Sequence, residues 1–147
     1  MNHPLFRIGT RDHLGLILMG KLAECFSDRD RWLSLDEVAR WGNFSQGYLE
    51  EIVAPLRQAK LVEARKGNGG GYRLVDEPRS ITVSDILTAL HGPIALVPCL
   101  DESVGCELTA SCGSHHMWST VQNEISKTIE RITLADIAKK PRAVATH

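Results

Sequence analysis

The chain lacks an excess of charge of either sign. Its 147 residues hold 17 Lys and Arg against 18 Asp and Glu, a formal net charge of −1. A surface that is basic all over is therefore excluded, and any contact with nucleic acid must come from a local patch. The chain also lacks an apolar run long enough to span a bilayer, and its first residues lack one of signal-peptide length. We expect a cytoplasmic protein with no membrane partner.

Cysteines are few, but most of them are concentrated in one place. Of the four, Cys99, Cys106 and Cys112 lie just before a pair of histidines, His115 and His116. Cytoplasmic thiols stay reduced, so this grouping favours metal ligation or redox sensing over structural disulfides. Thiolates are ligands for zinc, copper(I) and iron–sulfur clusters, and imidazole serves several of the same centres. The stretch is a candidate metal centre.

The N-terminal part of the chain predicts an amphipathic helix over residues 11–26, because apolar side chains recur there at helical spacing. Cys25 lies on this apolar stripe. We interpret it as a small buried hydrophobic residue and not as a ligand.

A second and a third helix follow. Ser34 and Glu37 have the spacing of a capping box, which predicts a short helix, and Gly42-Asn43 then turns the chain. Ser45 is a further N-cap, and residues 46–60 show helical apolar spacing. Two helices joined by a short glycine-containing turn are typical of a helix-turn-helix. Pro55 should kink or divide the second of them.

Two short β-capable runs, 61–66 and 72–75, surround the glycine-rich segment 67–71 and predict a hairpin. The segment lacks the Lys-Ser/Thr ending and the following helix that a phosphate-binding loop requires. A hairpin directly after a helix-turn-helix makes a winged helix. The predicted fold class is therefore mainly α with a small β-hairpin wing, to which a long dimerisation helix is added.

The near-neutral total hides two regions of opposite charge. Residues 57–79 carry six basic against three acidic side chains, and residues 101–130 carry five acidic against one basic. The N-terminus of a recognition helix reads base edges, and a basic wing approaches the DNA backbone. For Tyr48 and Tyr72, packing is an equal alternative to DNA contact. The predicted DNA-binding residues are Ser45, Gln46, Tyr48, Arg57, Arg65, Lys66, Asn68, Gly69, Gly70 and Tyr72.

The C-terminal part predicts a helix over 83–90, an irregular loop through the cysteines, and a long helix over about 114–132. An apolar stripe on the long helix favours a two-stranded dimer interface; it consists of Trp118, Val121, Ile125, Ile129 and Ile132. A final short helix is expected over 134–139, followed by a frayed tail over 141–147. We divide the chain into a winged helix-turn-helix domain (1–92), a ligand loop (93–113), and a dimerisation helix with its tail (114–147).

This order of features resembles the winged-helix bacterial regulators typified by IscR, an iron–sulfur cluster regulator, and NsrR, a nitric-oxide-sensing repressor. The resemblance covers about residues 7–140. The matching segments are Tyr48–Ile52 in the recognition helix, Leu56–Val62 before the wing, Lys66–Leu74 as the wing, and the three cysteines before the long helix.

The resemblance implies a homodimeric transcriptional regulator, usually a repressor, that binds double-stranded operator DNA. It senses redox state, nitric oxide or iron–sulfur status through a 2Fe–2S or 4Fe–4S cluster. Cys99, Cys106 and Cys112 match the family's cysteine ligands, and His115 matches the fourth ligand of IscR-like members. In NsrR-like members the fourth ligand comes from the partner's first helix, which makes Asp12 or His13 the alternative.

The same residues allow three interpretations other than a cluster-binding site. A structural zinc site would use the same Cys₃His set, although its cysteines usually come as close pairs. A metal-free thiol switch is the second. A cysteine-nucleophile enzyme, with Cys112 and His115 as nucleophile and base, is more remote, because no oxyanion element is visible and the wing would have no role. We predict that the protein is not an enzyme.

Overall fold

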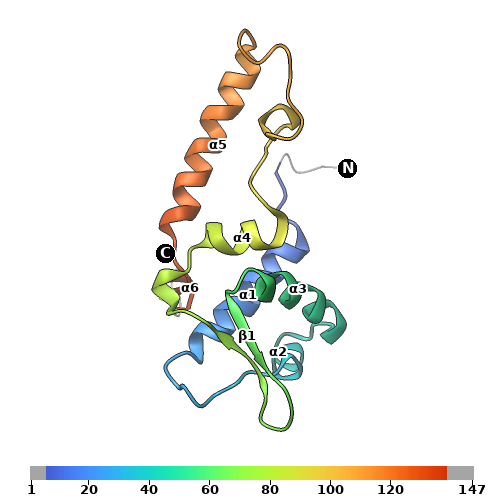
Figure 1. The fold of residues 1–147 in the computed structure, drawn as a ribbon, viewed down its shortest axis with the longest axis vertical. Coiled ribbons are helices and arrows are strands. Elements are labelled where there is room, and N and C mark those ends of the chain that lie inside the picture. Colours follow the sequence, from blue (N-terminus) through green and yellow to red (C-terminus); the bar gives the residue numbers. More distant parts are fainter. Residues whose placement is uncertain (1–5, 139–147) are drawn as a thin grey trace, which may run out of the picture.

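The computed structural model describes residues 6–138, and the predicted tail at 141–147 lies outside that range. A helix-turn-helix is followed by a hairpin, a connecting helix, a long loop, a long helix and a short helix (Figure 1). The helices are α1 (Thr10–Glu24), α2 (Leu35–Gly42), α3 (Gln46–Gln58), α4 (Val83–His91), α5 (Gly113–Arg131) and α6 (Leu134–Ala138). The strands are β1 (Val62–Arg65) and β2 (Gly71–Leu74), and two 3₁₀ turns are η1 (Pro78–Ser80) and η2 (Pro98–Leu100). The predicted fold class is confirmed.

The helix caps form as the sequence predicts. The hydroxyl of Ser34 accepts a hydrogen bond from the Glu37 backbone N–H at 3.2 Å, and the Glu37 carboxylate accepts one from the Ser34 N–H at 2.9 Å. Ser45 caps α3 through the backbone N–H of Tyr48 at 3.3 Å. The reciprocal bonds satisfy amides that the first helical turn leaves without partners. The caps fix where α2 and α3 begin.

The sequence predicts that Pro55 kinks or divides the third helix, and the structure contradicts the division. The helix α3 runs without interruption from Gln46 to Gln58 with Pro55 inside it. Proline removes the bond to the carbonyl four residues earlier, which belongs to Glu51, and its ring crowds the same carbonyl. Glu51 is on the exposed side of α3, where water can take the place of the lost donor.

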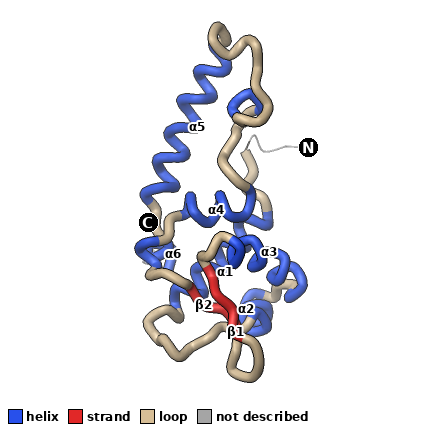
Figure 2. The backbone as a smooth tube through the Cα atoms, in the orientation of Figure 1, coloured by secondary structure: helices blue, strands red, loops and turns tan. Residues whose placement is uncertain are grey.

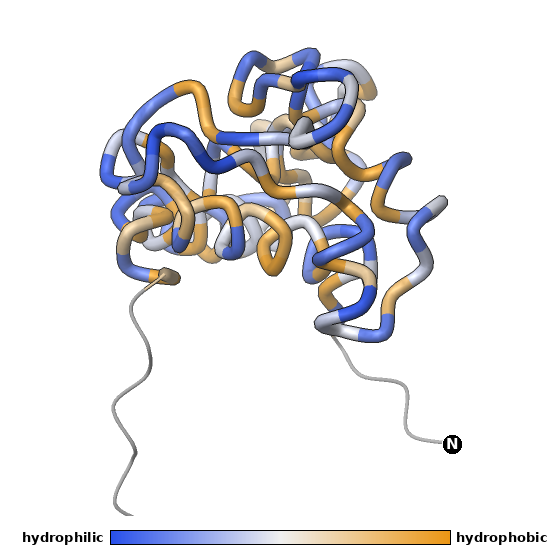
Figure 3. The backbone as a smooth tube through the Cα atoms, turned by 90° about the horizontal axis from the view of Figure 1, so that it is seen from below, coloured by the Kyte–Doolittle hydropathy of each residue, from blue (hydrophilic) through white to orange (hydrophobic). Residues whose placement is uncertain are grey.

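The hydrophobic core is built around α1. The helix α1 packs against α3, α4 and α6, its residues Leu18 and Met19 are fully buried, and Cys25 is half-buried against the core. Other fully buried core residues are Leu49, Ile52 and Leu56 of α3, Ile86 of α4 and Leu134 of α6. In the view along the axis from the wing end, short hydrophobic and hydrophilic segments alternate along the tube, as amphipathic elements require (Figure 3).

The hairpin is antiparallel, with Val62 opposite Leu74 and Arg65 opposite Gly71. The segment before α2 also pairs with it: Leu33 and Tyr72 exchange two backbone hydrogen bonds of 3.0 and 2.8 Å. Gly71 has φ +151°, and a Cβ there would lie 2.4 Å from the Leu33 carbonyl oxygen. Only glycine allows this close approach, so the segment before α2 is joined to strand β2 close to the turn of the wing.

The long helix α5 projects from the winged body, and the loop that precedes it runs alongside (Figures 1 and 2). No residue of α5 is buried. Its C-terminal end is held by backbone hydrogen bonds from Val83 to Ile132 (2.9 Å) and from Leu134 to Ile81 (2.8 Å). Leu134 of α6 is fully buried. Residues assigned from sequence to the C-terminal segment therefore complete the core of the winged body. Within 6–138, no helix combines the length and apolarity needed to cross a bilayer.

Candidate nucleic-acid interface and cysteine loop

The N-terminus of α3 presents polar, accessible residues. Ser45 and Gln46 are exposed, whereas Tyr48 is half-buried and packs against the core. The Ser45 hydroxyl oxygen already accepts the Tyr48 N–H, which leaves its proton available to an outside acceptor. Gln46 carries an amide that can bond an adenine edge. The structure thus presents Ser45 and Gln46 outward and gives Tyr48 a packing role.

The tip of the wing is the second polar surface. Arg65, Lys66, Asn68 and Gly69 are all exposed, and Gly69 adopts φ +74° in the turn. Gly70 is half-buried, and its N–H donates to the Gly67 carbonyl at 3.0 Å. Glycines have no side chain, and therefore allow the DNA backbone to approach the wing closely. Tyr72 differs from these residues because it is half-buried and packs against the core.

Ion pairs divide the basic residues of this region into two groups. The Arg73 Nε atom lies 2.6 Å from a Glu63 carboxylate oxygen, and the Arg79 Nε lies 3.1 Å from a Glu77 oxygen. A second set of cations makes no ion pair among the described residues: Arg57, Lys60, Arg65 and Lys66. These four exposed charges are the ones available to phosphate groups.

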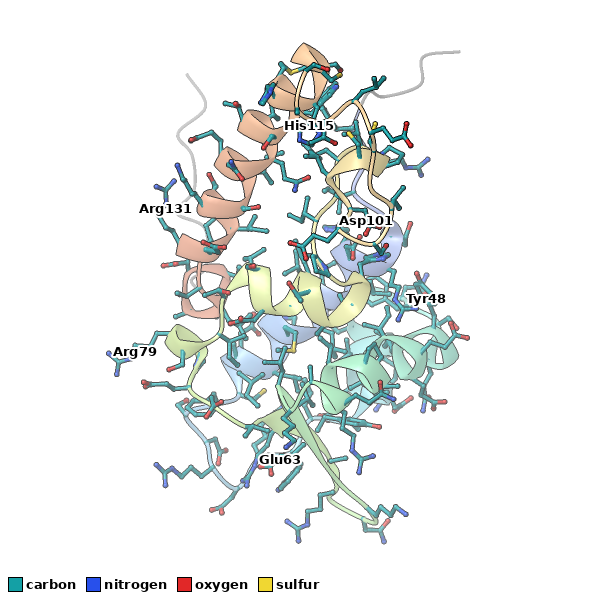
Figure 4. The ribbon with its side chains drawn as sticks, turned by 45° about the horizontal axis from the view of Figure 1, so that its top comes forward. Tyr48, Glu63, Arg79, Asp101, His115 and Arg131 are labelled. Atoms are coloured by element: carbon teal, nitrogen blue, oxygen red, sulfur yellow. The ribbon has the colours of Figure 1, made fainter. Side chains whose placement is uncertain are left out.

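The wing and the cysteine loop lie at opposite ends of the molecule. Figure 4 shows Glu63 on the wing near the lower end, Tyr48 on α3 at about mid-height, and His115 near the upper end of α5. The elements between the cysteine loop and the winged body are contiguous, since α4 packs against α1, α3 and α5.

The cysteine loop, from Gly92 to Cys112, is irregular except for η2. Cys99 lies on η2, Cys112 caps α5, and His115 lies in the first turn of α5. The loop folds back so that the Nδ1 atom of His115 is 3.3 Å from the Sγ atom of Cys99. The ring of His116 packs edge-on against that of His115, with centroids 5.8 Å apart. Two of the four predicted ligands are therefore in contact.

Acidic side chains of the loop are arranged by local turns. Asp101 accepts hydrogen bonds from the side chain of Ser103 at 2.6 Å and from its backbone N–H at 2.9 Å. These two bonds, the side-chain one foremost, hold the pKa of Asp101 below its ordinary value. Asp101 thus stays ionised and contributes to the negative charge of the loop.

The donor set has the chemistry of a soft metal centre, and the single chain assembles half of it. Cys106 is exposed and Cys112 is half-buried. Over the part of the chain that the structure describes, no three His, Cys, Asp or Glu side chains are grouped as metal ligands. Cys106 is followed and preceded by turns and adjoins Gly105, which has φ +67°. A rearrangement of this loop is needed to bring Cys106 and Cys112 to the Cys99–His115 pair.

The alternative fourth ligands sit at the start of α1. The Asp12 Oδ1 atom lies 2.9 Å from the His91 Nε2 atom, as an ion pair when His91 is protonated, without the alignment of a hydrogen bond. His13 is exposed. Neither residue is grouped with the cysteines in the single chain.

Sequence reasoning missed two features of the interface. Trp32, in the segment before α2, lies under Arg73 and Arg65 of the wing, and no spacing rule connects it with them. The Glu63–Arg73 pair could have been predicted from the sequence, because the glycine-rich turn defines the register of the hairpin and that register places the two residues opposite each other.

Comparison with known proteins gives consistent matches over nearly the whole chain. The model of the Rrf2 family, described as an iron-dependent transcriptional regulator, matches residues 8–140. The regulator CymR of Bacillus subtilis is 33% identical over 132 residues, which are 90% of this chain and 89% of CymR. The regulator IscR of Vibrio campbellii is 30% identical over 105 residues, or 71% of this chain and 62% of IscR.

Solved structures agree with these matches. The structure of CymR, called the global cysteine regulator of B. subtilis, has a TM-score of 0.77 at 34% identity and covers 93% of this chain and 99% of its own. The IscR structure from T. potens has a TM-score of 0.70 at 31% identity and covers 94% of each chain. These relatives are named as transcriptional regulators and not as enzymes, which confirms the prediction against the enzyme alternative.

Proposed function

The chain belongs to the Rrf2 family of transcriptional regulators. From this premise we propose that it is a homodimeric repressor whose affinity for operator DNA depends on an iron–sulfur cluster in the cysteine loop. DNA binding and transcriptional regulation are common to the family. The observation that carries the finer proposal is the contact between Cys99 and His115, which closes a loop that holds two further thiols.

On the DNA side, the N-terminus of α3 enters the major groove and the wing lies along the backbone. Gln46 reads a base edge, and the Ser45 hydroxyl donates to a phosphate. Arg65 and Lys66, which carry no ion pair among the described residues, supply the salt-dependent part of the affinity. The half-buried positions of Tyr48 and Tyr72 support roles in packing.

The second copy of the chain covers the apolar stripe of α5. Val121, Ile125 and Ile129 lie on one face of this helix, and none of them is buried in the single chain. A 19-residue helix with an apolar stripe and no buried residue needs a partner. Two crossed copies would place the two α3 helices for successive major grooves.

The cluster, if bound, supplies iron that keeps the thiols deprotonated and that can react with an oxidant or a signalling gas. Cys99, Cys106 and Cys112 are the proposed thiolate ligands, and His115 the nitrogen ligand, with Asp12 or His13 of the partner subunit as the alternative. The contact at 3.3 Å between Cys99 and His115 supports His115. Cys106 is exposed, which suits a ligand that coordinates the cluster after Cys99 and His115 have done so.

Coupling to DNA runs through α4 and α5. Backbone bonds at Val83 and Leu134 hold the far end of α5 to the winged body, so α5 and the body move together. When Cys106 and Cys112 are held against Cys99, the loop fixes the N-terminal end of α5. When they are released, the angle between the two copies changes. A coupling free energy of about 1–3 kcal/mol is enough to alter operator occupancy.

A cluster-free thiol switch is the second candidate function. The match to CymR along nearly the whole chain favours it, because one CymR is named as a cysteine regulator. So does the absence of a three-ligand group over residues 6–138. In this case Cys99, next to His115, and the exposed Cys106 would respond directly to oxidants. Zinc bound by the same residues would instead hold the loop in one state.

Affinity for DNA tests the proposal. The probe is a fluorescein-labelled duplex obtained by in vitro selection with the anaerobically purified protein. We expect salt-dependent binding, and a change of at least roughly tenfold in Kd when the iron is removed by a chelator. The Cys106→Ala variant should match the chelated protein. Binding that is the same with and without iron but changes on thiol oxidation would favour the second candidate.

A further inference from the structure

Trp32 forms a platform under two arginines of the wing. The guanidinium carbon of Arg73 lies 4.3 Å from the centroid of the Trp32 ring, and that of Arg65 lies 5.9 Å from it. Both distances fall within the range of a cation–π contact. Trp32 is half-buried and belongs to the segment that pairs with β2 through Leu33. Trp32 therefore contacts the wing from the segment before α2, which lies outside the hairpin.

The hairpin register explains why both arginines meet the same ring. Glu63 faces Arg73, and Arg65 faces Gly71. Alternate residues of a strand share a face, so Glu63, Arg65 and Arg73 project from one side of the hairpin. Gly71 has no side chain at the fourth position of this face. The two guanidinium groups can therefore lie side by side over Trp32.

Arg73 is held by polar bonds as well as by Trp32. Besides its contact with Trp32, Arg73 bonds to Glu63 at 2.6 Å and donates to the Arg29 carbonyl at 2.9 Å. Arg65 makes no ion pair among the described residues. Because the carboxylate of Glu63 is paired with Arg73, it does not offset the positive charge of Arg65 at the exposed end of the strand.

We propose that Trp32 is a positioning residue for DNA binding, which acts through Arg65. Its ring restricts the long Arg65 side chain to directions along the wing, and so reduces the conformational entropy lost when the guanidinium meets a phosphate. By holding Arg73 on Glu63, it also prevents Glu63 from neutralising Arg65. This inference rests on the proposed contact between the wing and DNA.

The segment that carries Trp32 is not itself a basic patch. Asp28, Arg29, Asp30 and Arg31 alternate in sign, and Arg31 lies 3.6 Å from Glu37. Its charges largely cancel, so the segment contributes to binding through Trp32 and not through an electrostatic surface of its own.

A double-mutant cycle on DNA affinity tests the proposal. The variants are Trp32→Leu, Arg65→Ala and their combination, with the selected duplex described above as the probe. Arg65→Ala should weaken binding roughly five- to tenfold and lower the slope of log K against log salt concentration by about 1. Trp32→Leu should weaken binding roughly two- to fivefold, the equivalent of one exposed cation–π contact, and shift the salt slope toward that of Arg65→Ala.

The combined variant decides the outcome. If Trp32 acts through Arg65, Trp32→Leu causes no further loss in the Arg65→Ala background. The matched control is Lys66→Ala, which removes the neighbouring charge that does not lie over the ring; its effect and that of Trp32→Leu should multiply. Thermal unfolding followed by circular dichroism checks the fold. If Trp32→Leu does not fold, Trp32→Phe, which keeps a ring with weaker attraction for cations, takes its place in the cycle.

Two results would overturn the inference, and they can be told apart. Effects of Trp32→Leu and Arg65→Ala that multiply would remove the positioning role and leave the wing contact standing. No effect of Arg65→Ala and Lys66→Ala would remove the wing contact itself, and with it both the inference and that part of the proposed function.

Discussion

His115, in the first turn of α5, lies within 3.3 Å of Cys99, sixteen residues earlier on η2, through its Nδ1 atom and the cysteine sulfur. The contact ties the entrance of the cysteine loop to its exit. It also ties the long helix, the proposed dimer contact, to the segment that leaves α4. Binding or oxidation at Cys99 therefore acts directly on this connection.

Replacing His115 by Ala should change the centre without unfolding the protein, because His115 is only half-buried and its polar contact is with the Cys99 sulfur. We expect a shifted visible absorption spectrum and faster loss of iron in air. His116→Ala is the matched control, since His116 is exposed and its ring packs edge-on against that of His115. An unchanged spectrum in His115→Ala, together with a changed one in Asp12→Ala or His13→Ala, would assign the fourth ligand to the partner subunit.

Arg73→Gln should weaken DNA binding although Arg73 is not proposed to touch DNA. Its removal leaves the Glu63 carboxylate, now 2.6 Å from Arg73, as an unneutralised negative charge on the wing. The double variant Arg73→Gln/Glu63→Gln should recover most of the lost affinity, which titrations at several salt concentrations would measure. Failure of the second change to restore binding would mean that Arg73 supports DNA binding in some way other than by neutralising Glu63.

Ile125→Glu should convert the dimer to a folded monomer. Ile125 is half-buried on the apolar stripe of α5, and a carboxylate there would be buried without a partner in the dimer. Sedimentation velocity distinguishes the two states. Asn123→Glu, an exposed position on the same helix, is the control and should remain dimeric. A dimeric Ile125→Glu variant would show that another face of the molecule pairs.

Leu134→Ala should destabilise the winged body by about 2–5 kcal/mol, the range for deleting a fully buried leucine side chain. Ile137→Ala, on the same helix but 37% exposed, should cost less than about 1 kcal/mol. Urea unfolding of both variants measures the difference. Equal small effects would mean that α6 is not part of the core.

The capping box of α2 should make stability depend on pH. Hydrogen bonding to the Ser34 backbone, foremost, and the charges of Arg31 and Arg40 lower the pKa of Glu37 below 4.5. A lowered pKa in the folded state means that the unfolded state binds the proton more tightly. The contribution of Glu37 is therefore present above pH 4.5 and is lost as the pH falls below it.

Glu37→Gln measures this contribution. Wild type should be more stable than the variant by about 0.5–1 kcal/mol at neutral pH, a modest amount because the Glu37 side chain is 43% exposed. The difference should shrink as the pH falls below 4.5, since both proteins are then uncharged at this position. A difference that does not change with pH would contradict the assignment.

The sequence predicts local features of this protein well, because they depend on local chemistry. The caps at Ser34 and Ser45, the hairpin around the glycine tip and the irregular loop all follow from spacing over a few residues. The contact of Cys99 with His115 joins two residues that the sequence already singled out. Pro55 is an exception, because tertiary packing of α3 outweighs the loss of one exposed hydrogen bond.

Features that depend on distant parts of the chain could not be predicted in the same way. The burial of Leu134 requires α6 to return to α1 after the long helix, and no period in the sequence encodes that return. The approach of Trp32 to Arg65 and Arg73 depends on the pairing of Leu33 with Tyr72, which is set by the close contact at Gly71. The positions of Cys106 and Cys112 relative to Cys99 depend on what the loop binds.

The most direct test of the account is the visible absorption spectrum of the protein purified without oxygen, with iron and acid-labile sulfide measured on the same sample. We predict a coloured protein with charge-transfer bands and comparable amounts of iron and sulfide, and the loss of all three signals in Cys106→Ala but not in Cys25→Ala. A colourless protein that carries zinc or no metal would contradict the cluster, and would leave a DNA-binding dimer whose cysteine loop acts as a structural zinc site or a thiol switch.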